Sequence, residues 1–169
     1  SPVGLCFRVV IRDDQHCNDK SESEIWQQDS LQFAFDPDSA KPWEPNAQFG
    51  LNGHRVLEYA VSSGKDKKIT VWRHTSYDPL LLDNVSEERV QVNFSREQGC
   101  SIYELIFPWE CLGLNTMPAP GSEIGFSALL NDVDPEPAPG APRGRHGLRI
   151  FKGIHPDKTP EKYGKLYLR

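Results

Sequence analysis

Oxygen-bearing side chains stand at the ends of the predicted strands, where the chain passes from a sheet into a loop. They are Asp13, Asp14, Asp29, Asp36, Asn131, Asp132 and Asp134. Calcium takes about six to eight oxygen ligands from carboxylates, amides and carbonyls, usually on loops. Asp and Asn are also frequent in turns for conformational reasons alone. If the strand ends converge, they bring Asp14, Asp29, Asn131 and Asp132 together, and we expect these four to hold a structural calcium ion.

The four tryptophans divide into two kinds by their surroundings. Trp72 lies within a predicted strand and Trp109 lies beside an apolar helical turn, so both are expected to pack in the core. Trp26 lies in a polar loop and Trp43 in a proline-rich loop. An indole on a loop offers a large apolar surface with little conformational entropy to lose. Trp26 and Trp43 are therefore candidate platforms for a ligand.

Two arginines follow a proline-rich segment late in the chain. Arg143 and Arg145 flank a glycine and precede His146. A guanidinium fork can donate hydrogen bonds to the hydroxyls or the carboxylate of a ligand. The alternative is a solvated loop without a ligand. We keep both arginines as candidate binding residues.

The sequence holds no recognisable catalytic motif. It has no glycine-rich phosphate loop, no GxSxG nucleophile elbow and no HExxH metal motif. The five histidines are scattered, and nothing selects the pair of facing carboxylates that a glycosidase needs. We therefore expect a protein that binds its ligand and catalyses nothing.

Length, charge and cysteine spacing limit the remaining classes. A chain of 169 residues fits one domain with its own core. The net charge of -5 argues against nucleic acid as a partner, and no run of about 18 apolar residues exists that could span a membrane. The four cysteines show no CxxC spacing, which argues against a zinc site. A disulfide between Cys100 and Cys111 is left open, and so is the redox compartment.

Short strands must position these residues. Apolar side chains alternate with polar ones in short runs separated by turn residues, a pattern that predicts about nine strands. They cover residues 5–12, 31–36, 55–61, 68–73, 90–95, 100–107, 123–130, 147–151 and 165–168. The 14 prolines and 13 glycines favour turns, so one or two helical turns at most are expected, one of them at 109–112. The pattern is typical of an all-β, antiparallel, jelly-roll-like sandwich over residues 1–169.

Several motifs occur in an order that is similar to one known family. They are Arg12-Asp13-Asp14-Gln15-His16, Trp26-Gln27-Gln28-Asp29-Ser30, Tyr103-Glu104-Leu105-Ile106-Phe107-Pro108-Trp109, Gly121-Ser122-Glu123-Ile124-Gly125, Asn131-Asp132 and Lys162-Tyr163-Gly164-Lys165-Leu166. Each motif alone is weak, but together they span nearly the whole chain. In this order they resemble the family 9 carbohydrate-binding module, within the wider group of DOMON-like sandwich domains.

The resemblance implies a β-sandwich with bound calcium and a non-catalytic site for sugars. Trp26 holds the place of one of two aromatic side chains that clamp a terminal sugar. Gln32 falls where the family has a sugar-binding glutamate, and Leu129 where it has a glutamine. A family arginine falls on Arg143 or Arg145.

The chain departs from the family pattern in two places. The second clamp tryptophan is missing from the stretch 154–158, so Phe151 or His155 would have to replace it. The family usually carries an N-terminal segment ahead of the position of Ser1. We therefore expect a truncated chain or a domain cut from a larger protein.

The leading hypothesis is a secreted, periplasmic or cell-surface module that binds a polysaccharide or oligosaccharide. A catalytic domain in the same polypeptide or complex is the expected partner, with neither nucleic acid nor a membrane. The expected sugar contacts are Trp26, Gln32, Trp43, Arg143, Arg145 and Phe151. The alternative is a structural accessory domain of a glycoside hydrolase or lyase without sugar affinity of its own. A haem-binding DOMON-type domain, which would rely on Met117, and a hydrolase or lyase in its own right are further alternatives.

Overall fold

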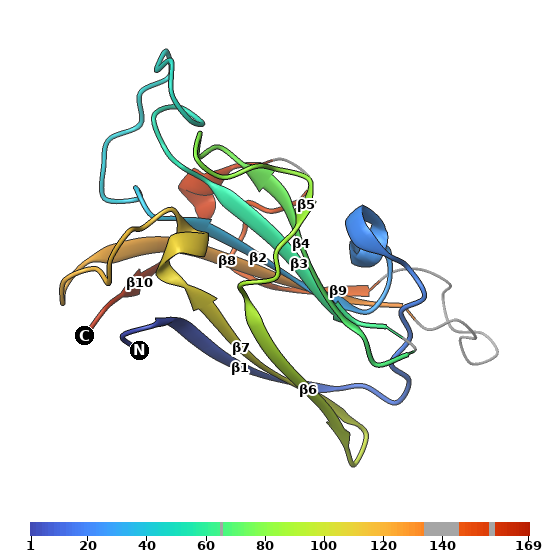
Figure 1. The fold of residues 1–169 in the computed structure, drawn as a ribbon. Coiled ribbons are helices and arrows are strands. Elements are labelled where there is room, and N and C mark those ends of the chain that lie inside the picture. The colour runs from blue at the N-terminus through green and yellow to red at the C-terminus, as the bar shows by residue number, and fades with distance from the viewer. Residues whose placement is uncertain (65, 134–145, 156–157) are drawn as a thin grey trace.

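The chain folds into two antiparallel β-sheets packed face to face (Figure 1). The computed structural model describes residues 1–64, 66–133, 146–155 and 158–169. The smaller sheet has the order β1–β7–β6, formed by Gly4–Arg12, Cys100–Pro108 and Gln91–Glu97. The all-β sandwich predicted from the sequence is therefore confirmed.

The larger sheet has seven strands in the order β10–β8–β2–β3–β4–β5, with β9 also paired to β8. These strands are β10 (Gly164–Tyr167), β8 (Glu123–Asp132), β2 (Ser30–Asp36), β3 (Leu57–Ser63), β4 (Ile69–Ser76), β5 (Val85–Ser86) and β9 (His146–Ile150). Every pairing is antiparallel. The strand predicted at 123–130 is β8, which lies between other strands of this sheet.

The core between the sheets is built by alternation along each strand. Phe33 and Phe35 of β2 face the small sheet, since strand side chains point to opposite faces in turn. They meet Phe107 of β7 at ring-centroid distances of 5.3 and 5.0 Å. Phe7 of β1 and Phe126 of β8 complete the cluster, with their centroids 5.3 Å apart. This aromatic core holds the two sheets together.

The outer face of the large sheet is also covered, because β2 and β3 are buried at every position. A second, smaller apolar cluster lies on that face and includes Ala34, Val56, Leu129, Ile154 and Tyr163. Ile154 and Tyr163 belong to the C-terminal segment that crosses the sheet before β10. This crossing segment builds one wall of the site described below.

Three short 3-10 turns join the strands in the described part of the chain. They are η1 (Glu22–Gln27), η2 (Trp109–Leu112) and η3 (Pro160–Lys162). η2 was predicted, whereas η1 was expected to be loop because its polar sequence shows no apolar period. β5 was also missed, since a strand of 2 residues cannot show alternation.

Two smaller expectations have clear outcomes. Trp109 is 7% exposed and its Nε1 donates to the backbone oxygen of Pro2 at 3.1 Å, which confirms a packing role. Cys100 and Cys111 are both free, so the open question of a disulfide between them is answered in the negative. Among the described residues, no helix is long and apolar enough to span a membrane.

Candidate functional site

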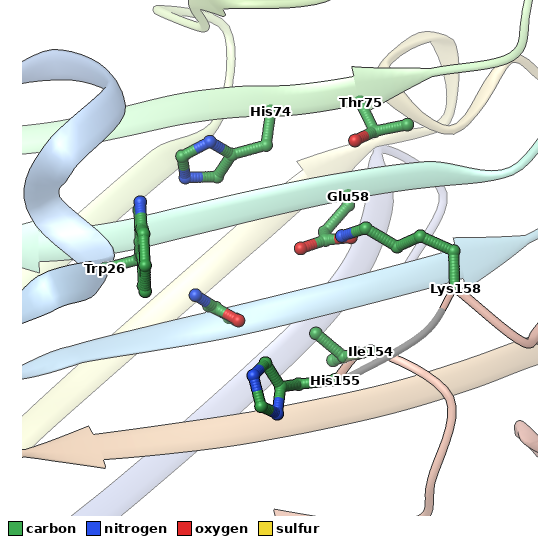
Figure 2. A pocket seen from close by; sticks show the side chains of 8 residues that line it. Trp26, Glu58, His74, Thr75, Ile154, His155 and Lys158 are labelled. Atoms are coloured by element: carbon green, nitrogen blue, oxygen red, sulfur yellow. The ribbon is translucent and has the colours of Figure 1, made fainter. Parts of the chain in front are cut away.

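A pocket of about 370 Å³ opens on the outer face of the large sheet. Its walls come from η1, from the neighbouring strands β2, β3 and β4, and from the C-terminal crossing segment (Figure 2). The lining residues are Trp26, Gln32, Glu58, His74, Thr75, Ile154, His155 and Lys158. In Figure 2 the indole of Trp26 is seen edge-on, with one face turned across the pocket toward Glu58 and Lys158.

Buried contacts fix the turn that carries Trp26. Ile25 is 1% exposed and anchors η1 against the sheet. The side-chain amide of Asn18, also 1% exposed, donates to the backbone oxygens of Ile25 at 2.8 Å and Asp29 at 3.0 Å. The same amide lies 2.9 Å from Ser62 Oγ on β3. Trp26 is therefore held half-buried at a defined place beside the sheet.

Two polar side chains form the floor of the pocket. Gln32 on β2 and Glu58 on β3 are 6% and 4% exposed. Both project from the outer face, because Gln32 pairs with Ala60 and Ala34 pairs with Glu58 in the β2–β3 register. A carboxylate accepts hydrogen bonds, whereas an amide both donates and accepts. The floor thus offers complementary groups to ligand hydroxyls.

Lys158 reaches over the floor from the C-terminal segment. Its Nζ donates to Glu58 Oε2, and the pair joins positions that are 100 residues apart. Burial lowers the pKa of Lys158 to about 8. The ammonium still has two more hydrogens to donate, since Lys carries three. Glu58 and Lys158 therefore place an acceptor and a donor side by side.

The imidazole of His74 adds a further polar group. Its Nε2 is buried and has no hydrogen-bond partner within the part of the chain that the structure describes. Burial lowers the pKa of His74, so the ring is neutral at physiological pH. A buried polar atom without a partner costs free energy. A ligand hydroxyl in the pocket would supply the missing partner.

The described lining residues offer groups that suit binding. Glu58 is the only carboxylate among its described lining residues. Glycoside hydrolysis ordinarily requires two carboxyl groups on either side of the bond. What the pocket does offer is one flat apolar face with donors and acceptors around it.

The structure brings only some of the residues predicted for the site together. Trp26 and Gln32 line the pocket, and so does His155, which the sequence offered as a substitute for a second clamp residue. Trp43 lies elsewhere, stacked on His54 with ring centroids 3.7 Å apart. Phe151 is 49% exposed and is not among the lining residues. Arg143 and Arg145 lie outside the described residues.

Five lining residues were not predicted from the sequence: Glu58, His74, Thr75, Ile154 and Lys158. Glu58 carried a signal, because a charged residue within a run of apolar strand residues needs a partner or a function. Lys158 gave no such signal, since the sequence does not show which strand its loop crosses.

A second cluster of polar groups lies at the N-terminal end of β2, beside Asp29 and Ser30. Ligand atoms of Asp13, His16 and Asp29 all lie within 4.8 Å of one another. Three of the four expected calcium ligands, Asp29, Asn131 and Asp132, line a small cavity there together with Asp13 and His16. The fourth, Asp14, is exposed and does not line it.

The donor atoms of this cluster do not suit calcium, which prefers about six to eight oxygen ligands. One of the three converging atoms is an imidazole nitrogen, which suits zinc, copper, iron or nickel. Arg96 donates to Asp13 Oδ2 at 3.0 Å. Burial raises the pKa of Asp29 to about 6 and lowers that of His16, although Asp13 and the hydrogen bond to Ser63 oppose the shift at His16. Calcium held by Asp14, Asp29, Asn131 and Asp132 stays a prediction.

Comparison with solved structures gives the same fold. One match is a family 9 carbohydrate-binding module from Caldicellulosiruptor kristjanssonii in complex with glucose, at a TM-score of 0.63 and 16% identity. It covers 99% of this chain and 72% of that chain. A module of the same family and organism in complex with cellotriose matches at a TM-score of 0.61 and 18% identity, covering 99% of this chain and 70% of that chain.

Comparison with sequences gives the family. No curated protein matches the sequence significantly. The family model described as "Carbohydrate family 9 binding domain-like" matches residues 4–168, which is nearly the whole chain. The carbohydrate-binding module that the sequence motifs resemble is thus confirmed at the level of the family. The chain belongs to the family of carbohydrate family 9 binding domain-like proteins.

Proposed function

We propose that this domain binds a single sugar ring in the pocket beside Trp26 and does no chemistry on it. The observation that carries the proposal is the position of the Trp26 indole. Its face forms one wall of the pocket, across from the ion pair of Glu58 and Lys158. One apolar wall with polar groups opposite matches a pyranose, which has C–H groups on its faces and hydroxyls at its edge.

The physical basis of binding is stacking combined with hydrogen bonding. When the C–H face of a sugar stacks on the indole, both apolar surfaces are removed from water. This burial contributes roughly 25 cal/mol for each Å² of apolar area. Gln32, Glu58, His74 and Lys158 would then select the orientation of the ring through its hydroxyls. Affinity is modest in this proposal, because few anchors must offset the entropy that the ligand loses.

Glucose and cello-oligosaccharides are the first ligands to test. Both solved relatives are complexes with such sugars, glucose in one and cellotriose in the other. The pocket suits a neutral sugar, because Glu58 and Lys158 neutralise each other and His74 is uncharged. The wider proposal is a secreted module that holds a polysaccharide-degrading enzyme on its substrate.

One observation favours a second candidate function, a structural accessory domain without sugar affinity. The ion pair of Glu58 and Lys158 already satisfies much of the hydrogen bonding on the floor of the pocket. In addition, His155 stands at the pocket where a second indole would give a tighter clamp. Direct measurement of sugar binding separates the two candidates.

The test is isothermal titration calorimetry with glucose, cellobiose and cellotriose on the wild type and two matched variants. Trp26→Ala should weaken binding by about 2 kcal/mol, roughly thirtyfold in Kd, because the stacking face is lost. Trp43→Ala removes the other loop tryptophan and should leave the Kd unchanged. Equal affinity in the wild type and Trp26→Ala would contradict the stacking role. No heat with any sugar in a wider panel would favour the structural domain.

A further inference from the structure

The cluster at the N-terminal end of β2 contains a histidine whose tautomer the surrounding structure defines. The Nε2 atom of His16 lies 2.8 Å from the backbone oxygen of Ser63. A carbonyl oxygen can only accept, so Nε2 carries the hydrogen. In the neutral ring the lone pair is then on Nδ1. That atom lies 3.9 Å from Asp13 Oδ2 and 3.7 Å from Asp29 Oδ2.

A lone pair facing two carboxylates is an arrangement that a cation would stabilise. All three atoms are rich in electrons and lie within 4.8 Å of one another. The side chains of Asp13 and His16 are 7% and 9% exposed, and that of Asp29 is 6% exposed, so water screens them little. Arg96 approaches Asp13 at 3.0 Å, and its positive charge also helps to lower the pKa of His16. The space between the three atoms therefore suits a small positive ion.

A fourth ligand atom lines the same cavity. Asn131 is 1% exposed, and its Oδ1 has no hydrogen-bond partner in the described part of the chain. The direction of its amide is defined as well. Ser30 Oγ donates its only hydrogen to the backbone oxygen of Gln28 at 3.0 Å, so it must accept from Asn131 Nδ2 at 3.1 Å. The carbonyl oxygen of the Asn131 side chain is thereby left for the cavity.

Each ligand is also held by a second partner on its far side. His16 is held by Ser63, Asn131 by Ser30, and Asp13 by Arg96. Both oxygens of Asp29 accept backbone hydrogens, from Cys17 at 2.5 Å and from Val133 at 2.7 Å. Such outer partners orient the ligands of a metal and are a regular part of metal sites.

The dimensions agree with one small ion. The cavity has a volume of about 10 Å³ for a water-sized particle, which is the space of a single particle. Zinc bonds to nitrogen and oxygen are about 2.0–2.2 Å long, which sets tetrahedral ligand atoms about 3.4 Å apart. The two measured separations from His16 Nδ1, 3.7 and 3.9 Å, need to shorten by only a few tenths of an ångström.

We propose that Asp13, His16, Asp29 and Asn131 bind one zinc-like divalent transition-metal ion, which ties β1, the loop before η1, β2 and β8 together. The set has one imidazole nitrogen and three oxygens, which suits zinc better than calcium. The absence of CxxC spacing does not bear on this site, because none of its ligands is a thiol. The site shares no lining residue with the sugar pocket, so it is independent of the proposed sugar binding.

The test begins with protein stripped by a chelator and uses calorimetry with zinc chloride and calcium chloride. We expect one zinc per chain, bound at least tenfold more tightly than calcium, and a higher melting temperature with zinc, because an ion bound to the native state stabilises it. Cobalt should give visible bands of a four-coordinate site without the thiolate-to-cobalt charge-transfer band. That band would show that a cysteine is the ligand and would overturn the assignment.

Matched variants locate the ion. Asp13→Asn and His16→Gln should each weaken zinc binding at least tenfold, whereas Asp14→Asn, on the neighbouring exposed residue, should leave it unchanged. The melting temperatures of the metal-free variants control for folding, since Asp13→Asn also breaks the contact with Arg96. Calcium binding as tight as zinc binding, unchanged zinc affinity in a folded His16→Gln variant, or no zinc binding at all would each overturn the proposal.

Discussion

Glu58 and Lys158 form an ion pair inside the pocket that Trp26 lines, although 100 residues separate them in the sequence. Glu58 belongs to β3 and Lys158 to the segment that crosses the outer face of the large sheet. The pair therefore does two things at once. It holds the crossing segment on the sheet, and it presents the polar groups that would face a sugar.

Breaking this ion pair tests both roles. Lys158→Met keeps the length of the side chain but removes the charge and leaves the Glu58 carboxylate buried alone. We expect sugar affinity to fall about tenfold, which is about 1.4 kcal/mol, and the melting temperature to fall as well. Glu58→Gln should have a similar effect. The double variant measures the coupling, which we expect to be about 2 kcal/mol; additive single effects would mean that the two groups act separately.

Gly153 is a point where backbone geometry controls the pocket. Its φ is +105°, and an added Cβ would lie 2.4 Å from the backbone oxygen of Thr159. Gly153→Ala should therefore lower the free energy of unfolding by about 2 kcal/mol or more and shift Ile154 and His155, which weakens sugar binding. The control is Gly121→Ala, where φ is +87° but nothing lies within 4 Å. That variant should lose about 1 kcal/mol in a urea titration and keep its sugar affinity.

Asp38 gives the protein a predictable response to acid. Arg55 donates to its carboxylate through Nε at 2.7 Å and Nη2 at 2.8 Å, and Lys41 Nζ lies 2.7 Å from it. Burial alone would raise the pKa of Asp38, but the hydrogen bonds from Arg55 and Lys41 outweigh burial and hold the pKa well below its usual range. The charged carboxylate is thus favoured in the folded state. Its stabilisation is complete above the unfolded pKa of about 4 and is lost as the pH falls through the folded pKa.

The comparison of wild type with Asp38→Asn isolates this effect. At neutral pH the variant should lose about 3 kcal/mol of unfolding free energy, because Arg55 keeps its charge without its main partner. The difference between the two proteins should shrink as the pH falls below about 4. Urea unfolding at pH 7 and at pH 3 measures it. An equal difference at both pH values would show that ionisation of Asp38 is not the source.

Asn18 should control the sugar site without touching the sugar. Its buried amide links the end of η1 to β3, so Asn18→Ala removes several hydrogen bonds and leaves backbone oxygens of Ile25 and Asp29 without their partner. We expect a loss of about 2 kcal/mol in stability and a weaker affinity for sugar, because Trp26 is less well held. Asn93→Ala changes an asparagine at an exposed contact with Glu104 and should alter neither quantity.

The alternation of apolar and polar residues was enough to predict most of the strands. Alternation over residues 31–36 puts Phe33 and Phe35 on one face of the strand and Gln32 on the other. The structure places the first two in the core and the third in the pocket. The same rule separates Asp13 from Asp14. Asp13 continues the inward set of β1 after Ile11, whereas Asp14 continues the outward set and is exposed.

The pocket beside Trp26 was only partly predictable from local sequence. Trp26 was recognisable because an indole in a polar loop stands out within a few residues of sequence. Glu58, His74 and Lys158 were not, because what unites them is the order of β2, β3 and β4 in the sheet and the path of a distant loop.

Local patterns thus determine most of the strands and the family. They also determine the apolar face of a strand, since the direction of a side chain depends only on whether its position is odd or even. Contacts between remote parts of the chain decide the rest. They set the strand order, the crossing of the C-terminal segment and the approach of His16 to Asp29. Those contacts are chosen by the burial of the whole core, and no short stretch of sequence contains that information.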